Sequence, residues 1–106
     1  MRILLDECVP KRLKRSFRPQ HLALTVPDAG LAGYKNGLLL RRIVGKFDVF
    51  ITTDKSIQHQ QRIADYAISF VLLRARSNDI TDIEPLVPKL LARWGELAPG
   101  KLLVIQ

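Results

Sequence analysis

The sequence predicts an α/β protein of three layers, α/β/α, in which helices cover both faces of a mostly parallel five-stranded sheet. Five short apolar runs alternate with segments that carry helix signals, in the order β-α-β-α-β-α-β-α-β. The runs at 49–53 and 68–73 are continuously apolar or β-branched, as in strands of a parallel sheet that is buried on both faces. The chain has 106 residues and neither a linker nor a repeat, so residues 1–106 are expected to form one domain.

The first half of the chain predicts three strands and two helices. Residues 2–5 (RILL) are too few for a helix and predict a strand, as do residues 22–26 (LALTV) and 49–53 (VFITT). Pro10 suits the first turn of a helix that runs to about Phe17 and exposes a basic face. The turn at 27–30 has Pro and Gly at suitable places. Asn36 is a candidate cap for a helix that runs to about Phe47.

The second half predicts two helices and two strands. Asp54 or Ser56 is expected to cap a helix that runs to about Tyr66, and residues 68–73 (ISFVLL) follow it as a strand. A last helix is predicted over about Thr81 to Leu97, with Pro85 in its first turn and Pro88 as a candidate kink. Residues 102–105 predict the final strand, either parallel or an antiparallel edge strand.

The chain is strongly basic. It carries 17 Lys and Arg against 10 Asp and Glu, a net charge of +7, and its pI is about 10.1. Such a balance favours a polyanionic partner such as nucleic acid. Two other interpretations stay open, namely a surface that serves solubility and an acidic protein partner.

Several features predict a cytoplasmic protein that does not enter a membrane. No apolar run reaches the length of about 18 residues that a membrane-spanning helix needs. The N-terminal apolar run meets Asp6 and Glu7 after three residues, unlike a secretory signal. Cys8 is the single cysteine, so it has no partner for an internal disulfide, which fits a reducing cytosol.

Acidic residues follow the predicted strands of this basic chain. Asp6 and Glu7 follow the first strand, Asp28 follows the second and Asp54 the third. Ligands of a parallel sheet bind beyond the carboxyl ends of its strands. If the first and third strands are neighbours, Asp6 and Asp54 lie within about 5–10 Å of each other.

Carboxylates at that separation repel each other unless a cation joins them or one is protonated. Their hard oxygen atoms suit Mg²⁺ or Mn²⁺, which activates water and clamps a phosphodiester. Each acid also has an ordinary interpretation. Asp54 would be a helix cap, Asp28 a turn residue, and Asp6 with Glu7 a solvated strand end.

Three motifs, LLDECVP (4–10), TVPDAGLAG (25–33) and VFITTDKS (49–56), resemble the PIN-like family of short bacterial proteins related to VapC-type toxin ribonucleases. The resemblance spans most of the chain, because RARSND (74–79) followed by a helix fits the later part of the family pattern. It implies a PIN-like fold, RNA cleavage that depends on Mg²⁺ or Mn²⁺, and a toxin–antitoxin pair in which an antitoxin protein is the partner.

The resemblance also implies site residues. Asp6 matches the first metal-site acid, Asp54 the acid after the T-x-D strand, and Asp28 the acid after the second strand, so these three are the expected catalytic residues. Asn78 or Asp79 stands near the last acid, and Glu7 and Asp79 complete the expected metal ligands. RNA contacts are expected from Arg12, Arg15, Lys55, Arg74, Arg76, Ser77 and Asn78.

One departure from the family keeps other functions open. PIN nucleases usually carry an acid on a central helix, whereas residues 36–46 have none, and Asn36 or Glu7 are the candidates for its role. The alternative is therefore a catalytically degenerate PIN-like module that binds RNA or an antitoxin. A phosphoacceptor receiver domain would share the strand-end acids, but receivers place a lysine after the last strand, where this chain has Gln106. Apolar groups on the second or fourth helix suggest a homodimer as a further hypothesis.

Overall fold

The computed structural model describes residues 1–106, except for the side chain of Asn36. Its five strands form one sheet in the order β2-β1-β3-β4-β5, and every neighbouring pair is parallel. The strands are β1 (Arg2–Leu5), β2 (Leu22–Thr25), β3 (Val49–Thr52), β4 (Ser69–Leu73) and β5 (Leu102–Ile105). The predicted α/β class and parallel five-stranded sheet are confirmed. The antiparallel alternative for the last strand is wrong, because β5 pairs with β4 in parallel.

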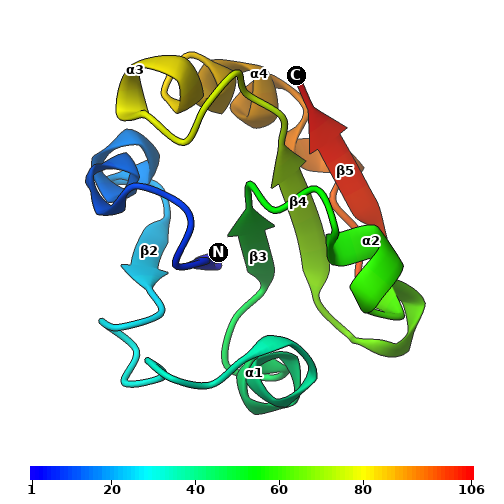
Figure 1. Cartoon of the computed structure of the whole chain (residues 1–106). Coiled ribbons are helices and arrows are strands. Elements are labelled where there is room, and N and C mark those ends of the chain that lie inside the picture. The colour runs from blue at the N-terminus through cyan, green and yellow to red at the C-terminus, as the bar shows by residue number, and fades with distance from the viewer.

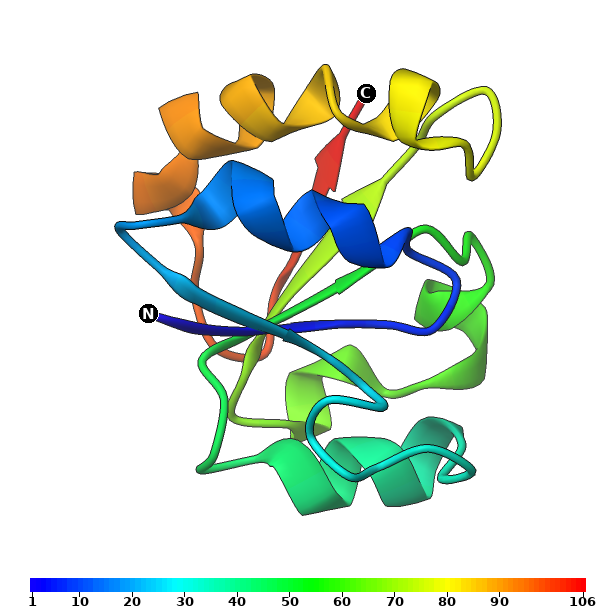
Figure 2. The ribbon, with the colours of Figure 1, turned by 90° about the vertical axis from the view of Figure 1, so that its left-hand side faces the viewer.

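Helices cover both faces of this sheet, as Figures 1 and 2 show. One face carries the 3₁₀ helix η1 (Lys11–Phe17), α3 (Ile80–Ile83), α4 (Leu86–Ala92) and the 3₁₀ turn η3 (Trp94–Glu96). The other carries α1 (Asn36–Ile43), α2 (Ile57–Gln60) and the 3₁₀ turn η2 (Ile63–Asp65). The arrangement is the three-layer architecture that the sequence predicts. Among the described residues, no helix combines the length and the apolar character needed to cross a bilayer.

Two separate apolar cores hold the three layers together, because successive strand residues point to opposite faces of the sheet. On β1, Ile3 and Leu5 pack with Leu13, Phe17 and other residues of the η1 and α4 side. Leu4 lies between them in sequence and packs on the other side, with the α1 residues Leu40 and Ile43. Burying one such side chain stabilises the fold by about 1.5–3 kcal/mol. All five residues of β4 are buried, as its continuous apolar run predicts.

The helices differ from prediction more than the strands do. The helix predicted to reach Phe47 ends at Ile43, and Gly45 follows it with a φ of 86°. The predicted cap by the Asn36 side chain lies outside the described residues. The helix predicted up to Tyr66 is interrupted after Gln60, because Ile57 is its single buried residue and a short helix needs packing to persist.

The last predicted helix is also divided. It breaks at Glu84 and Pro85 into α3 and α4, because Pro85 has no N–H to continue the helical hydrogen bonds. Its start at Ile80 agrees with the predicted start at about Thr81, and the Asp79 carboxylate accepts a hydrogen bond from the Thr81 N–H and so caps α3. This capping gives Asp79 a structural task at the beginning of α3.

The strand order creates a switch point between β1 and β3. The chain passes from β1 to β2 on one side, and all later strands are added on the other side, next to β3. The connections that leave β1 and β3 therefore diverge, which opens a crevice at the carboxyl ends of these strands. Pairing between the two strands continues to their ends, since the Asp6 N–H donates to the Ile51 carbonyl at 2.9 Å.

Candidate active site

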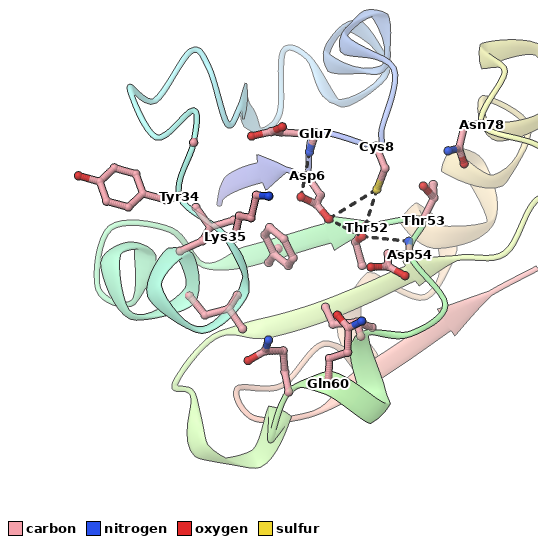
Figure 3. Close-up of a pocket in the computed structure, with 16 residues that line it drawn as sticks. Asp6, Glu7, Cys8, Tyr34, Lys35, Thr52, Thr53, Asp54, Gln60 and Asn78 are labelled. Carbon is pink, nitrogen blue, oxygen red and sulfur yellow. Dashed lines mark hydrogen bonds between the residues drawn. The ribbon is translucent and has the colours of Figure 1, made fainter.

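A cavity of about 450 Å³ lies at the carboxyl ends of β1 and β3 (Figure 3). This volume is within the range of about 300–1,000 Å³ that is typical of small-molecule sites. The residues that line it come from the β1 and β3 ends, the α1 and α2 regions and the loop after β4: Asp6, Glu7, Cys8, Gly33, Tyr34, Lys35, Leu39, Leu40, Phe50, Thr52, Thr53, Asp54, Ile57, Gln60, Gln61 and Asn78. The cavity thus occupies the crevice that the strand order produces.

The hydroxyl group of Thr52 joins the two acid-bearing strand ends. Thr52 is fully buried at the end of β3, and its Oγ1 donates to Asp6 Oδ2 at 2.7 Å. The same oxygen accepts a hydrogen bond from the Asp54 N–H at 3.1 Å. A hydroxyl has one proton and two lone pairs, so Thr52 can serve both groups at once. It thereby fixes Asp6 relative to the backbone of Asp54, as the dashed lines in Figure 3 show.

The Asp6 carboxylate is held by further contacts at the cavity wall. Its Oδ1 accepts from the Glu7 N–H at 2.9 Å, and its Oδ2 lies 3.5 Å from the Cys8 sulfur. The sulfur is also 3.4 Å from Thr52 Oγ1. Each carboxylate oxygen has about two acceptor sites. Among the described residues, Oδ1 accepts one hydrogen bond, from the Glu7 N–H. It therefore retains a second acceptor site for a ligand.

Asp54 combines a local structural contact with a place on the cavity. Its Oδ1 accepts from the Ser56 hydroxyl at 2.7 Å and from the Ser56 N–H at 2.9 Å. These two bonds, the hydroxyl first, lower the pKa of Asp54, while partial burial opposes them. The carboxylate is therefore ionised at neutral pH. Among the described hydrogen bonds none involves Oδ2, which leaves that oxygen for a ligand.

The structure does not bring Asp28 to this cavity. Asp28 Oδ2 accepts from the Lys14 ammonium at 2.7 Å and from the Thr25 N–H at 3.0 Å. The Asp28 N–H in turn donates to the Thr25 hydroxyl at 3.2 Å. The Lys14 bond, followed by the Thr25 bonds, lowers the pKa of Asp28 to about 2. Its described contacts are those of a turn residue that is neutralised by a lysine.

The other predicted site residues divide into three groups. Glu7 and Asn78 line the cavity with Asp6 and Asp54. Asp79 caps α3, and Ser77 donates to Asp82 at 2.6 Å. The remaining predicted RNA contacts are exposed and lie outside the cavity lining: Arg12, Arg15, Lys55, Arg74 and Arg76.

Several lining residues were missed by the sequence reasoning. Lys35 stands just before α1, and Gln60 and Gln61 follow Ile57 in what reads as an ordinary polar helix face. Thr52 reads as one more β-branched strand residue. The signal that was available for Thr52 is its position directly before an acid-bearing loop. The positions of Lys35 and Gln60 depend on tertiary packing, for which the sequence carries no short-range signal.

The donor atoms of the cavity fit one kind of metal site. Among the described His, Cys, Asp and Glu side chains, no group of three or more is placed to hold a metal ion. Mg²⁺, however, is usually bound by one or two carboxylates and completes its shell with water and substrate phosphates. Asp6 and Asp54 offer this minimal set, with Glu7 and the Asn78 amide along the same cavity. The donors therefore fit a hydrated ion, and not a cage made of protein ligands.

Thr53 contains an unusual polar atom beside these donors. Its Oγ1 is buried and has no hydrogen-bond partner among the described atoms. An unpaired buried hydroxyl costs about 1–3 kcal/mol of stability. Thr52 and Thr53 are adjacent threonines that differ in their hydroxyl groups. The Thr52 hydroxyl is hydrogen-bonded, and the Thr53 hydroxyl has no described partner.

Comparison of the chain with protein-family models, with curated proteins and with solved structures finds no match. The resemblance to PIN-like proteins therefore stays a prediction.

The two threonines predict opposite effects of the same substitution. Thr52→Val removes the donor to Asp6 and the acceptor of the Asp54 N–H, so it should lower the free energy of unfolding by about 1–3 kcal/mol. Thr53→Val removes an unsatisfied hydroxyl and should leave the stability unchanged or raise it. Urea denaturation of both variants checks this. Equal losses of stability in the two variants would contradict the contacts described here.

The lowered pKa of Asp28 predicts how the free energy of unfolding depends on pH in the acid range. The pKa of the Asp28 carboxyl group falls from 3.8 to about 2 on folding. The ionised group therefore stabilises the folded protein above pH 3.8, and this contribution is lost as the pH falls towards 2. In Asp28→Asn, the free energy of unfolding should therefore fall less steeply between these pH values. Lys14→Met, which removes the first cause of the shift, should show the same flattening. Acid titration of unfolding measures it, and identical slopes in the wild type and Asp28→Asn would refute the assignment.

Proposed function

We propose that this protein is a metal-dependent ribonuclease that hydrolyses phosphodiester bonds of RNA at the cavity between Asp6 and Asp54. The observation that carries the proposal is the buried Thr52 hydroxyl, which ties Asp6 to the Asp54 backbone at the switch point of the sheet. Asp6 and Asp54 line one cavity and neither takes part in a described ion pair, so both carboxylates are available to a divalent cation. They occur in a chain of net charge +7, which favours a polyanionic substrate.

Asp6 and Asp54 would hold the ion, Mg²⁺ or Mn²⁺, with the carboxylate oxygens that their described hydrogen bonds leave available. When bound, the ion supplies an activated water and neutralises charge on the scissile phosphate. Thr52 and Ser56 keep the two carboxylates in fixed orientations, which lowers the cost of organising the site during the reaction. Lys35 is the basic residue of the cavity lining and is therefore the candidate to hold a neighbouring phosphate.

The biological setting follows from the resemblance and is part of the same proposal. It comprises a toxin–antitoxin pair, an antitoxin protein as partner and a cytoplasmic location. A homodimer is also proposed, and its candidate contacts are Leu38 on α1 and Leu91 on α4, which are 48% and 39% exposed and lie on opposite faces of the sheet. Light scattering on the purified protein separates dimer from monomer.

A second candidate is a degenerate module that binds RNA or an antitoxin without cleaving RNA. Two observations favour it. The described side chains contain no group of three metal-ligating residues, and Asp28 pairs with Lys14 away from the cavity. RNA binding that weakens steeply with salt, without turnover in Mg²⁺ or Mn²⁺, would support this candidate over the nuclease.

The strand order also occurs in receiver domains, which carry a phosphoacceptor acid at the same switch point. Here the residue after β5 is Gln106, where receivers use a lysine. Incubation with acetyl phosphate followed by mass measurement tests this possibility. Uptake of one phosphoryl group on Asp54 would favour a receiver over the nuclease.

The nuclease proposal predicts that both acids are required for turnover. Wild-type protein should cleave single-stranded RNA in Mg²⁺ or Mn²⁺ and stop when EDTA is added. Asp6→Asn and Asp54→Asn should each lower the cleavage rate by about 100-fold or more, because each removes a negative charge at the ion. A gel assay with labelled RNA measures the rates.

The matched control is Asp65→Asn, which removes an exposed carboxylate paired with Arg62 outside the cavity. This variant should cleave at the wild-type rate. Absence of cleavage by the wild type with either ion, together with absence of ion binding in calorimetry, would refute the proposal.

A further inference from the structure

We propose that the α2 side of the cavity is a nucleobase subsite, in which the Gln60 amide contacts the edge of one unpaired base. The inference rests on the proposed nucleic-acid substrate. It specifies that the cavity recognises one base of that substrate. It follows from a chemical division within the cavity. Asp6, Thr52 and Asp54 form one part, while the α1 and α2 regions form another of different character.

This second part has an apolar wall. Leu39 and Leu40 of α1, Phe50 of β3 and Ile57 of α2 line it and belong to one buried cluster. A hydrated metal ion or a phosphate gains nothing from such a wall. A nucleobase does, because each of its two ring faces is apolar and polarisable, and packs favourably against apolar and aromatic side chains.

Polar groups at the edge of this wall suit the edge of a base. Gln60 and Gln61 both line the cavity, and a side-chain amide offers two donors and an acceptor. Gln61 is directed towards α1, since a Cβ placed on Gly37 would lie 3.6 Å from its Oε1. Gln60 is exposed, and Figure 3 shows it on the α2 side of the cavity. Gln60 is the more exposed of the two amides and is therefore the one assigned to the base edge.

A cationic group stands at a third place on the rim. Lys35 lines the cavity from the segment before α1. Beside it, Tyr34 also lines the cavity, and its ring carries the guanidinium of Arg42, which lies 4.8 Å from the ring centre and outside the cavity lining. The cavity thus presents an apolar wall, an amide, one lysine and two carboxylates. The apolar wall suits the face of a base and the amide suits its edge. The lysine suits a phosphate, and the carboxylates suit the cation that accompanies a phosphate.

The size of the cavity limits the state of the nucleic acid. About 450 Å³ suits one small ligand, so a base must leave its helix and its pairing partner to enter. The ligand is one unpaired nucleotide residue, from either a free nucleotide or a single strand. The net charge of +7 favours a strand, whose additional phosphates would bind outside the cavity.

The test measures binding in EDTA, so that it is independent of cleavage. Fluorescence anisotropy compares a labelled single-stranded RNA hexamer of mixed sequence with a fully abasic ribose-phosphate hexamer. The abasic hexamer should bind about tenfold more weakly. Gln60→Ala should weaken binding of the normal hexamer by about fivefold to tenfold, as expected for one lost hydrogen-bonding group, and leave binding of the abasic hexamer unchanged.

Gln58→Ala is the matched control. Gln58 is an exposed glutamine of the same helix that does not line this cavity, so its replacement should change neither affinity. Thermal unfolding should give the same Tm for both variants, because both side chains are exposed. Equal affinity for the two hexamers, or equal effects of Gln60→Ala and Gln58→Ala, would overturn the subsite.

Two further outcomes are informative. Displacement of the hexamer by AMP or UMP at similar concentrations would support the subsite and identify free nucleotides as its source. Hexamers that bind far more tightly than either nucleotide would support the subsite within a single strand. Base-dependent binding, with neither cleavage nor ion binding by the wild type, would refute the ribonuclease and leave the subsite standing. Cleavage without base-dependent binding would support the ribonuclease and refute the subsite.

Discussion

The hydrogen bond from Thr52 to Asp6 is the interaction on which the candidate site depends. Thr52 is fully buried at the end of a central strand, where an unsatisfied hydroxyl would cost stability. Its partners are the Asp6 carboxylate, at the end of the neighbouring strand, and the backbone N–H of Asp54. The contact that stabilises the β1–β3 junction therefore also orients the Asp6 carboxylate and fixes the backbone of Asp54 beside it. Stability and site geometry at this junction are coupled through one hydroxyl group.

Charge distinguishes these acids from Asp28. Lys14 lies 2.7 Å from Asp28 and neutralises it, while Ser56 and the backbone of Glu7 offer Asp54 and Asp6 neutral donors. Among the described ion pairs, none involves Asp6 or Asp54. Hydrogen bonds from neutral groups stabilise a carboxylate without cancelling its charge. The cavity therefore keeps the negative charge that an incoming cation requires, inside a protein whose total charge is positive.

The sequence predicted the strands and the cavity acids better than the helices and the remaining site. Strand runs such as Phe70–Leu73 are apolar because both faces of the strand are buried. Such continuous apolar runs can be recognised from the sequence alone. Asp6 and Asp54 could be predicted because parallel strands bring their carboxyl ends to one edge. The role of Asp28 could not, because its partner Lys14 is fourteen positions away and meets it through the packing of η1 beside β2. Gln60 and Lys35 likewise reach the cavity through tertiary packing alone.

The most direct measurement is a crystal of the protein soaked in Mn²⁺ and examined at a wavelength where manganese scatters anomalously. The account predicts an anomalous peak in contact with the carboxylates of both Asp6 and Asp54, and none at Asp28. Absence of a peak at this cavity, or a peak bound to Asp28 alone, would contradict it.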